Sequence, residues 1–356
     1  MAGDKVVDVV IVSADMGAMT RACVAEIEHD DVASIVIVDN AFGAARVGDG
    51  AAGGEGGEAG AGADIAPKAG DGRDGGEGGD AAHGTAIGSE REALAQRARI
   101  VALARRQGFA AANNRGVEVG EARYVLLLNS DILAVRGAIG QLAEAMDADA
   151  GAVAAGGRLV DADTLVTQPG YRPRAFPSLA SFLVIVLGIE ERWPGNPVTR
   201  RYHGAPLDEQ RVQAVAAQPA AAALMVRREA LEAIGGLDER FWFWFEDSDL
   251  LLRLSGRGRI LYVPQAVFRH LGGGTFGGWS KSERIRSIHH GMLHYGDAHF
   301  SRAQRAALGA AAIAASVPRI ALFARSRPQE AAAWRAVAAG GLALLRGRRP
   351  GAIAGG

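Results

Sequence analysis

Short runs of β-branched and aliphatic residues constrain the fold of this chain more than any other feature. Residues 6–13 and 34–39 are two such runs, and the stretch between them, residues 19–28, has helical character. Together they predict a β-α-β unit. Residues 124–129 form a third run that is apolar almost throughout. Strands that are apolar on both faces are typical of a parallel sheet covered by helices. We therefore expect an α/β fold.

A glycine-rich segment interrupts this pattern. Residues 43–89 contain 17 glycines among 47 positions and almost no large apolar side chains. Such a composition cannot bury enough surface to fold, and we predict a disordered insertion. Apolar structure resumes at residues 100–103. The expected organisation is one domain over residues 1–300, which contains the insertion, and a basic helical tail over residues 301–356.

The charge of the whole chain is nearly balanced, with a formal net charge of −1, which argues against nucleic acid as a partner. Its distribution is uneven, because nine arginines follow Ser301 and Glu330 is the only acid there. The single cysteine, Cys23, excludes an internal disulfide framework and agrees with a reducing compartment. The short apolar run between Asp4 and Asp8 predicts a strand and not a signal peptide. We expect a cytoplasmic protein.

Two apolar stretches in the tail bear on membrane contact. Residues 306–317 form a run stopped by Pro318 and Arg319, too short for the roughly 20 residues of a spanning helix. Residues 331–345 form a second stretch with arginines at its margins. Apolar helices with arginine margins can lie in an anionic membrane surface, and the alternative is a helical cap over the domain. We expect peripheral contact at the inner face of the plasma membrane through this tail.

Three aspartates stand at or just after the ends of predicted strands, namely Asp15, Asp39 and Asp131. Ligands of open α/β sheets bind beyond the carboxyl ends of the strands, so these acids can converge on one edge. Asp131 is suited to a hard divalent cation such as Mg²⁺ or Mn²⁺, which prefers oxygen ligands. Asp39 can accept a hydrogen bond from a nucleobase or ribose. The alternative for each is an ordinary turn or capping acid.

A second group of acids, Glu246, Asp247 and Asp249, directly follows the aromatic run 241–245. The leucines behind them are spaced as on one face of a helix, which places the acids in its first turn. There the free N–H groups and the helix dipole favour the ionised carboxylate, which can act as a general base. The alternative is N-capping of a surface helix. For the aromatic run we expect a strand whose side chains alternate between an acceptor site and the core.

Six motifs carry a family resemblance: VVIVSAD at residues 9–15, IVIVDNAF at 35–42, GFAAANNRG at 108–116, YVLLLNSD at 124–131, ALMVRREALEAIGGLDERFWFWFEDSDLLLRL at 223–254 and HLGGGT at 270–275. In this order they resemble the inverting family 2 glycosyltransferases, especially the rhamnosyltransferase-like bacterial branch. The resemblance implies the GT-A nucleotide-diphospho-sugar transferase fold, a Rossmann-like mixed sheet flanked by helices, here with a C-terminal helical extension.

The resemblance also implies roles for individual residues. Asp131 and His270 would hold Mg²⁺ or Mn²⁺, and Asp247 would be the catalytic base, with Glu246 and Asp249 beside it. The residues implied at the nucleotide-sugar are Ser13, Asp15, Asp39, Asn113, Asn114 and Asn129. For both asparagines of the 108–116 motif a helix-capping role is the alternative.

The implied activity is transfer of L-rhamnose from dTDP-rhamnose to a glycan or lipid-linked acceptor, in cell-envelope polysaccharide synthesis. Residues 13–15 read Ser-Ala-Asp where the family has Thr-Tyr-Asn, which puts the donor in doubt. A family member that uses a UDP-sugar and a non-catalytic glycan-binding relative therefore remain alternatives. A nucleotidyltransferase is disfavoured, because the first strand is not followed by a glycine-rich phosphate loop with a basic residue.

Overall fold

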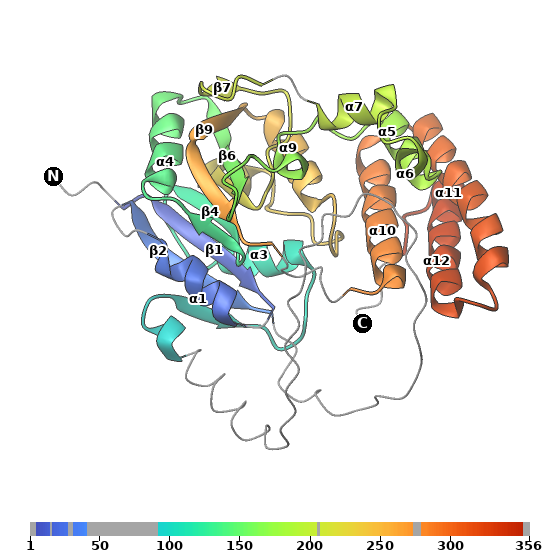
Figure 1. Ribbon diagram of the computed structural model, residues 1–356, viewed down its shortest axis with the longest axis horizontal. Coiled ribbons are helices and arrows are strands. Elements are labelled where there is room, and N and C mark those ends of the chain that lie inside the picture. The colour runs from blue at the N-terminus through green and yellow to red at the C-terminus, as the bar shows by residue number, and fades with distance from the viewer. Residues whose placement is uncertain are drawn as a thin grey trace, which may run out of the picture.

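The computed structural model describes residues 5–14, 16–27, 31–40, 92–204, 207–272 and 279–351. The predicted insertion at 43–89 and the candidate Asp15 lie outside these residues. Within them the chain forms one mixed sheet with helices on both faces, and a group of long helices stands at one end of the molecule (Figure 1).

Nine strands form the sheet in the described ranges, in the order β3-β2-β1-β4-β8-β6-β9-β5, with β7 paired to β9. Their bounds are β1 Val7–Ser13, β2 Val32–Asp39, β3 Arg99–Ala102, β4 Tyr124–Asn129, β5 Ile132–Ala134, β6 Ala152–Asp161, β7 Gln213–Ala214, β8 Ala223–Arg227 and β9 Arg259–His270. Strands β1 to β4 run parallel, as expected. Strand β8 is antiparallel to both β4 and β6, so the sheet is mixed.

The helices are α1 Ala18–Ala25, α3 Phe109–Val117, α4 Ala138–Ala148, α5 Leu179–Val186, α6 Ile189–Arg192, α7 Pro197–His203, α8 Arg228–Ala233, α9 Glu246–Ser255, α10 Lys281–His299, α11 Arg302–Phe323 and α12 Pro328–Leu345, with one 3₁₀ turn, η1, at Pro169–Tyr171. Strand β1, helix α1 and strand β2 form the predicted β-α-β unit. Helices α10 to α12 form a C-terminal helical extension, of which α11 and α12 lie in the predicted tail of residues 301–356 and α10 precedes it (Figure 1).

The core explains why the strands are apolar on both faces. Val9 and Ile11 of β1 join one buried cluster with α1 and α4, whereas Val10 joins another with α3, α8 and α9. Alternate residues of a strand point to opposite faces, so a sheet covered on both sides needs apolar residues at every position. A third cluster joins α5 to the C-terminal helices around Phe182 and Tyr295.

The aromatic run 241–245 does not form the expected strand. Phe241 is fully buried, and Trp244 and Phe245 have left-handed backbone angles, with φ of 75° and 68°. A left-handed residue breaks the extended conformation, and two in succession turn the chain sharply into α9. The side chains therefore do not alternate across a sheet face.

The expected stop at Pro318 is also wrong. Helix α11 continues through Pro318 to Phe323 and has 22 residues, long and apolar enough to cross a membrane by length and composition alone. A proline removes one helical N–H, which usually weakens a helix. Here Ser316 Oγ donates to Ala312 O at 2.6 Å, and Arg319 Nη1 donates to Ala315 O at 2.7 Å. These side chains add hydrogen bonds around the proline and help the helix to continue.

Candidate active site

Strand pairing brings together Asp131 and His270, the two predicted metal ligands. Strand β5 begins at Ile132, which lies opposite His270 at the end of β9. The backbone N–H of Leu271 donates to Asp131 O at 3.0 Å. In this register His270 Nε2 lies 3.3 Å from Asp131 Oδ2.

The environment of His270 determines which ring nitrogen carries the proton. Nδ1 lies 3.0 Å from Gln168 Oε1, which can only accept, so Nδ1 donates, and in the neutral ring Nε2 then keeps its lone pair. The Tyr171 hydroxyl lies 3.2 Å from Nε2. Burial, and then the charge of Asp131, raise the pKa of Tyr171 to about 12, so this hydroxyl stays protonated and donates to Nε2. A lone pair on Nε2 beside a carboxylate, with Nδ1–H held by an acceptor, is the arrangement that metal-binding histidines adopt.

This pair supplies only part of a metal coordination shell. In the described residues no group of three or more His, Cys, Asp or Glu side chains could hold a metal ion. An imidazole and a carboxylate are suitable donors for Mn²⁺, and a cation bound by few protein groups completes its shell with phosphate oxygens and water. Asp131 and His270 therefore fit a divalent ion that is shared with a phosphate ligand.

Asp247 lies in the first turn of α9, as predicted, and its side chain is 21% exposed. Its Oδ1 accepts from the Ser248 N–H at 2.7 Å, and its Oδ2 lies 3.7 Å from Arg174 Nη2. Asp247 thus has a helix N-terminus on one side and a guanidinium on the other, and part of it remains accessible to a substrate.

The neighbouring Glu246 lies in a different environment. Its side chain is buried, and Oε2 has no hydrogen-bond partner in the described part of the chain. Burial, and then the charge of Asp247, raise the pKa of Glu246 to about 8. Glu246 therefore holds its proton at neutral pH and does not share the role of a charged base. Two adjacent carboxyl groups with different environments can take different protonation states.

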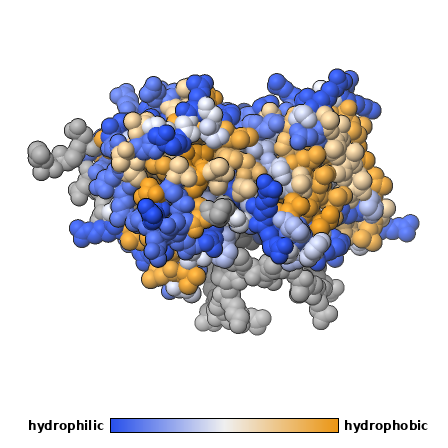
Figure 2. Space-filling view, turned by 90° about the horizontal axis from the view of Figure 1, so that it is seen from above, coloured by the Kyte–Doolittle hydropathy of each residue, from blue (hydrophilic) through white to orange (hydrophobic). Residues whose placement is uncertain are grey.

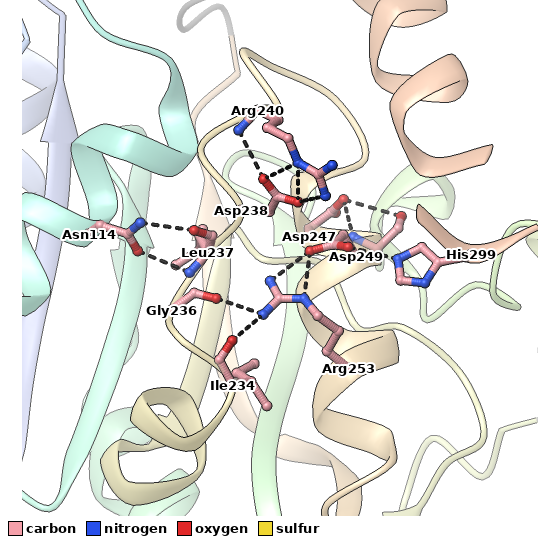
Figure 3. Close-up of polar contacts among 11 residues, drawn as sticks. Asn114, Ile234, Gly236, Leu237, Asp238, Arg240, Asp247, Asp249, Arg253 and His299 are labelled. Carbon is pink, nitrogen blue, oxygen red and sulfur yellow. Dashed lines mark hydrogen bonds and ion pairs between the residues drawn. The ribbon is translucent and has the colours of Figure 1, made fainter. Parts of the chain in front are cut away.

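Asp249 lies in the same first turn of α9 as Asp247, and its carboxylate makes structural contacts. Its buried carboxylate lies 2.6 Å from Arg253 Nη2 and 2.7 Å from Nε2 of His299, the last residue of α10 (Figure 3). Arg253 also donates to the carbonyls of Ile234 and Gly236. These contacts tie α9 to α10 and to the preceding loop, so Asp249 positions the helix that carries Asp247.

The amides of Asn113 and Asn114 are also engaged within the protein. Asn113 Nδ2 donates to Phe109 O within α3 at 2.9 Å. Asn114 Nδ2 donates to Leu237 O at 2.9 Å, and Asn114 Oδ1 accepts from the Leu237 N–H at 3.0 Å (Figure 3). The second pair of bonds fixes the loop before α9. Nucleotide contact by these two residues stays a prediction, and both amides already serve local structure.

The carboxyl ends of β1, β2 and β4 lie at the edge where we predict nucleotide binding. Ser13 pairs with Asp39, and Val12 pairs with Asn129, so the three strands end side by side. The hydroxyl of Ser13 is buried, lies 2.8 Å from Thr20 Oγ1 and accepts from a backbone N–H. A ligand at this edge would therefore meet the backbone of Ser13 and not its hydroxyl.

Residues that the sequence did not single out connect the two halves of the site. Gln168 and Tyr171 contact His270, and three residues further along Arg174 contacts Asp247. Reciprocal backbone bonds with Gln218, of 3.0 and 2.7 Å, hold Arg174 in place. The sequence did contain one signal that could have identified these residues. Loops often carry functional residues, and this loop combines proline and glycine with a tyrosine and arginines.

The turn that leads into α9 is strained and is pressed by α10. A Cβ at Gly291 of α10 would lie 2.3 Å from the carbonyl oxygen of Trp244, so this position needs glycine. Left-handed residues other than glycine are costly, and they persist where the surroundings enforce them, often at functional sites. Here Trp244 and Phe245 immediately precede the two carboxyl groups of the candidate site.

Comparisons with known proteins show which family part of the chain resembles. Residues 86–235 match the family model of Glycosyl transferase family 2. N-acetylglucosaminyl-diphospho-decaprenol L-rhamnosyltransferases from two strains of Mycobacterium tuberculosis are 33% identical over 149 residues, which cover 41% of this chain and 46% of theirs. The chain thus spans about half the length of these curated relatives.

Similarity to solved structures extends over more of the chain. The structure of GalNAc-T7 with UDP, GalNAc and Mn²⁺ superposes with a TM-score of 0.52 at 13% identity, over 82% of this chain and 48% of that one. Although the family match begins at residue 86, β1 pairs with β4 and β2 pairs with β1, so the earlier strands belong to the same sheet. This sheet has the GT-A fold, and the segment of residues 86–235 that matches the glycosyl transferase family 2 model lies within it.

Proposed function

We propose that this protein is an inverting glycosyltransferase that moves a sugar from a nucleoside diphosphate to an acceptor hydroxyl. The loop of residues 168–174 carries the proposal, because it contacts His270 at one end and Asp247 at the other. We infer from this that the two groups border one site. A single transfer reaction needs a donor-binding group and a base at such a common site.

Asp131 and His270 form the donor side. They are suited to hold Mg²⁺ or Mn²⁺ against the diphosphate, and the GalNAc-T7 structure contains Mn²⁺ together with UDP. A divalent cation there would offset the negative charge that develops on the leaving diphosphate. Gln168 keeps the Nε2 lone pair of His270 available, and Asp39 at the end of β2 is placed for the nucleoside.

Asp247 forms the acceptor side. The acceptor oxygen forms the new bond to the anomeric carbon and gives its proton to the Asp247 carboxylate. The bond to the diphosphate breaks, and its electron pair leaves with the diphosphate. Attack opposite this bond inverts the anomeric centre. Glu246 stays protonated beside Asp247, so it adds no second negative charge, and Arg174 supplies the counter-charge. General-base assistance of this kind contributes roughly 10²- to 10⁴-fold to the rate.

The proposed donor is dTDP-rhamnose, and the proposed acceptor is a lipid-linked or free glycan of the cell envelope. The support is the partial similarity to the L-rhamnosyltransferases, whose name also specifies a diphospho-decaprenol acceptor. Specificity depends on individual side chains of the site and not on the fold. A UDP-sugar donor therefore remains the alternative.

A thermal-shift panel of dTDP-, UDP- and GDP-sugars with Mg²⁺ or Mn²⁺, followed by transfer assays, tests the proposal. We expect a selective shift with dTDP-rhamnose. Asp247→Asn should abolish transfer and retain donor binding, whereas Asp163→Asn, at an exposed acid, should change neither. A preference for UDP-sugars would overturn the donor. Binding without turnover would indicate a glycan-binding relative, and loss of donor binding in Asp247→Asn would overturn the role of Asp247 as base.

A further inference from the structure

The outward face of α11 lacks the charged residues that surface helices normally carry. Its exposed residues beyond the first turn are all apolar, and they recur every three or four positions, so they form one stripe along the helix. They are Ala307, Ala310, Ala314, Val317, Pro318, Ala321 and Leu322. The largest of them, Val317 and Leu322, are 58% and 71% exposed. We call this set the apolar stripe.

The opposite side of α11 packs against the rest of the protein. Leu308 and Ala312 are buried in the cluster that contains Tyr295. Gly309 lies so close to α12 that a Cβ there would be 2.5 Å from Gly341 O. Although α11 is long enough to span a bilayer, this packing holds it along the side of the molecule. Only the apolar stripe remains for an external partner.

Neighbouring helices extend the apolar surface. Leu342 and Leu345 are exposed on α12, and Leu187, at the end of α5, accepts a hydrogen bond from Arg319 of α11. Trp193, which ends α6, is also exposed. Figure 2 shows apolar residues gathered over this end of the molecule, with hydrophilic residues at its corners. Monomeric soluble proteins rarely expose a continuous apolar area of this kind unless it binds a partner.

The charge around the stripe indicates which partner it fits. Helix α11 contains no acid, and Arg302 and Arg325 lie just at its two ends. Arg335 is exposed on α12, and Arg346, which caps the end of this helix, is also exposed. Glu330, the single acid in residues 301–351, lies within 4 Å of Lys281 and Arg327 and is largely shielded. An apolar centre with a cationic border is complementary to a bilayer surface with anionic headgroups.

We propose that the apolar stripe, with its border of arginines, docks this protein in the plane of an anionic lipid bilayer. The apolar side chains enter the boundary between headgroups and acyl chains, and the arginines contact phosphate groups. Docking in this way needs no sugar nucleotide and no acceptor. It therefore stands independently of the proposed transfer reaction.

Vesicle flotation of the full chain tests the proposal, with phosphatidylcholine vesicles and with vesicles that also contain phosphatidylglycerol. We expect binding to the anionic vesicles that falls with added salt. Val317→Asp with Leu322→Asp should weaken the partition coefficient on the order of 100-fold, because two aliphatic groups are lost from the interface and two negative charges are added. The matched control is Leu165→Asp with Val166→Asp, at positions that are 63% and 65% exposed on the turn after β6, and it should bind as the wild type does.

Replacement of arginines around the apolar stripe tests their contribution separately from that of the apolar side chains. Arg325→Gln, Arg335→Gln and Arg346→Gln together should weaken binding to anionic vesicles on the order of 100-fold and leave weak binding to neutral vesicles unchanged. The control variant changes three exposed arginines of the sheet domain, in Arg99→Gln, Arg136→Gln and Arg257→Gln. These substitutions should have little effect on vesicle binding.

Three results would overturn the proposal. The first is no binding of the wild type to anionic vesicles, and the second is an equal loss in the stripe variant and its control. The third is self-association in lipid-free buffer that the stripe variant abolishes, without vesicle binding by the wild type, since the stripe would then join two copies of this chain. Unchanged thermal unfolding of each variant would show that any loss of binding is not a loss of fold.

Discussion

Arg174 Nη2 lies 3.7 Å from Asp247 Oδ2, across the boundary between the loop that follows β6 and the first turn of α9. The same guanidinium lies 5.9 Å from the centre of the Tyr202 ring. Arg174 is therefore held by its backbone bonds to Gln218 and by an aromatic ring, and it presents its charge to the proposed base. We interpret Arg174 as a residue that positions Asp247.

Replacement of Arg174 tests this interpretation. Arg174→Gln removes the charge beside Asp247 and should lower kcat roughly 10- to 100-fold, since a misplaced base loses much of its contribution. The KM for the donor should change little, because Arg174 does not contact the Asp131–His270 pair. Arg174→Lys should recover part of kcat if charge is what matters. Equal kcat values for the Lys and Gln variants would contradict the interpretation, and Arg172→Gln, in the same loop, is the matched control.

Gln168 should control the affinity for metal without being a ligand. Gln168→Leu removes the acceptor for His270 Nδ1–H, so the ring can rotate or change tautomer. Loss of such a partner typically lowers metal affinity 10- to 100-fold. Titration of Mn²⁺ by electron paramagnetic resonance, with a nucleoside diphosphate present, measures this directly. Gln210→Leu, at an exposed loop position, should leave the titration unchanged. An unaltered titration in Gln168→Leu would exclude a role of Gln168 in orienting His270 for the metal.

Gly291 should be needed for the turn that starts α9. In Gly291→Ala the new methyl group meets the carbonyl of Trp244, and the turn or α10 must shift. Overpacking of this kind typically costs about 1 to 3 kcal/mol. Urea unfolding measures the loss, and transfer activity should fall with it because Glu246 and Asp247 follow the turn. Gly195→Ala is the control, since a Cβ at Gly195 has no atom within 4 Å. Wild-type stability of Gly291→Ala would contradict the packing argument.

Local patterns predicted the parts of the fold that depend on local physics. The apolar run of β4 was expected at its observed bounds, because a strand buried on both faces needs apolar residues throughout. The leucine spacing behind Asp247 placed the acids in the first turn of α9 for a similar reason. Such patterns indicate which side chains are buried, and the burial of a side chain depends on its own position along the strand or helix.

Features that depend on distant segments could not be predicted in this way. The left-handed angles of Trp244 and Phe245 arise where α10 presses on the turn, and no pattern within the aromatic run records this contact. The bonds of Gln168 to His270 and of Asp249 to His299 likewise join elements that are far apart in the chain. The resemblance to a family placed Asp131 and His270 together, whereas composition and spacing alone did not.

Glu246 should make the stability of the protein depend on pH between about 4.5 and 8. Its pKa is raised to about 8 by burial and by Asp247, so over this range the folded state keeps a proton that the unfolded state releases. The stabilisation is complete below the lower limit, decreases as the pH rises through the window and levels off above it. At about 1.4 kcal/mol per pKa unit the change amounts to a few kcal/mol.

Glu246→Gln cannot release a proton, so its stability relative to the wild type should rise from pH 5 to pH 8. Urea unfolding at both pH values measures the difference between the two proteins, in which the contributions of groups that do not interact with Glu246 cancel. Glu144→Gln, at an exposed acid of α4, should show no such change. Parallel pH dependence of wild type and Glu246→Gln would mean that Glu246 is charged in the folded protein, and the separate protonation states of Glu246 and Asp247 would then have to be abandoned.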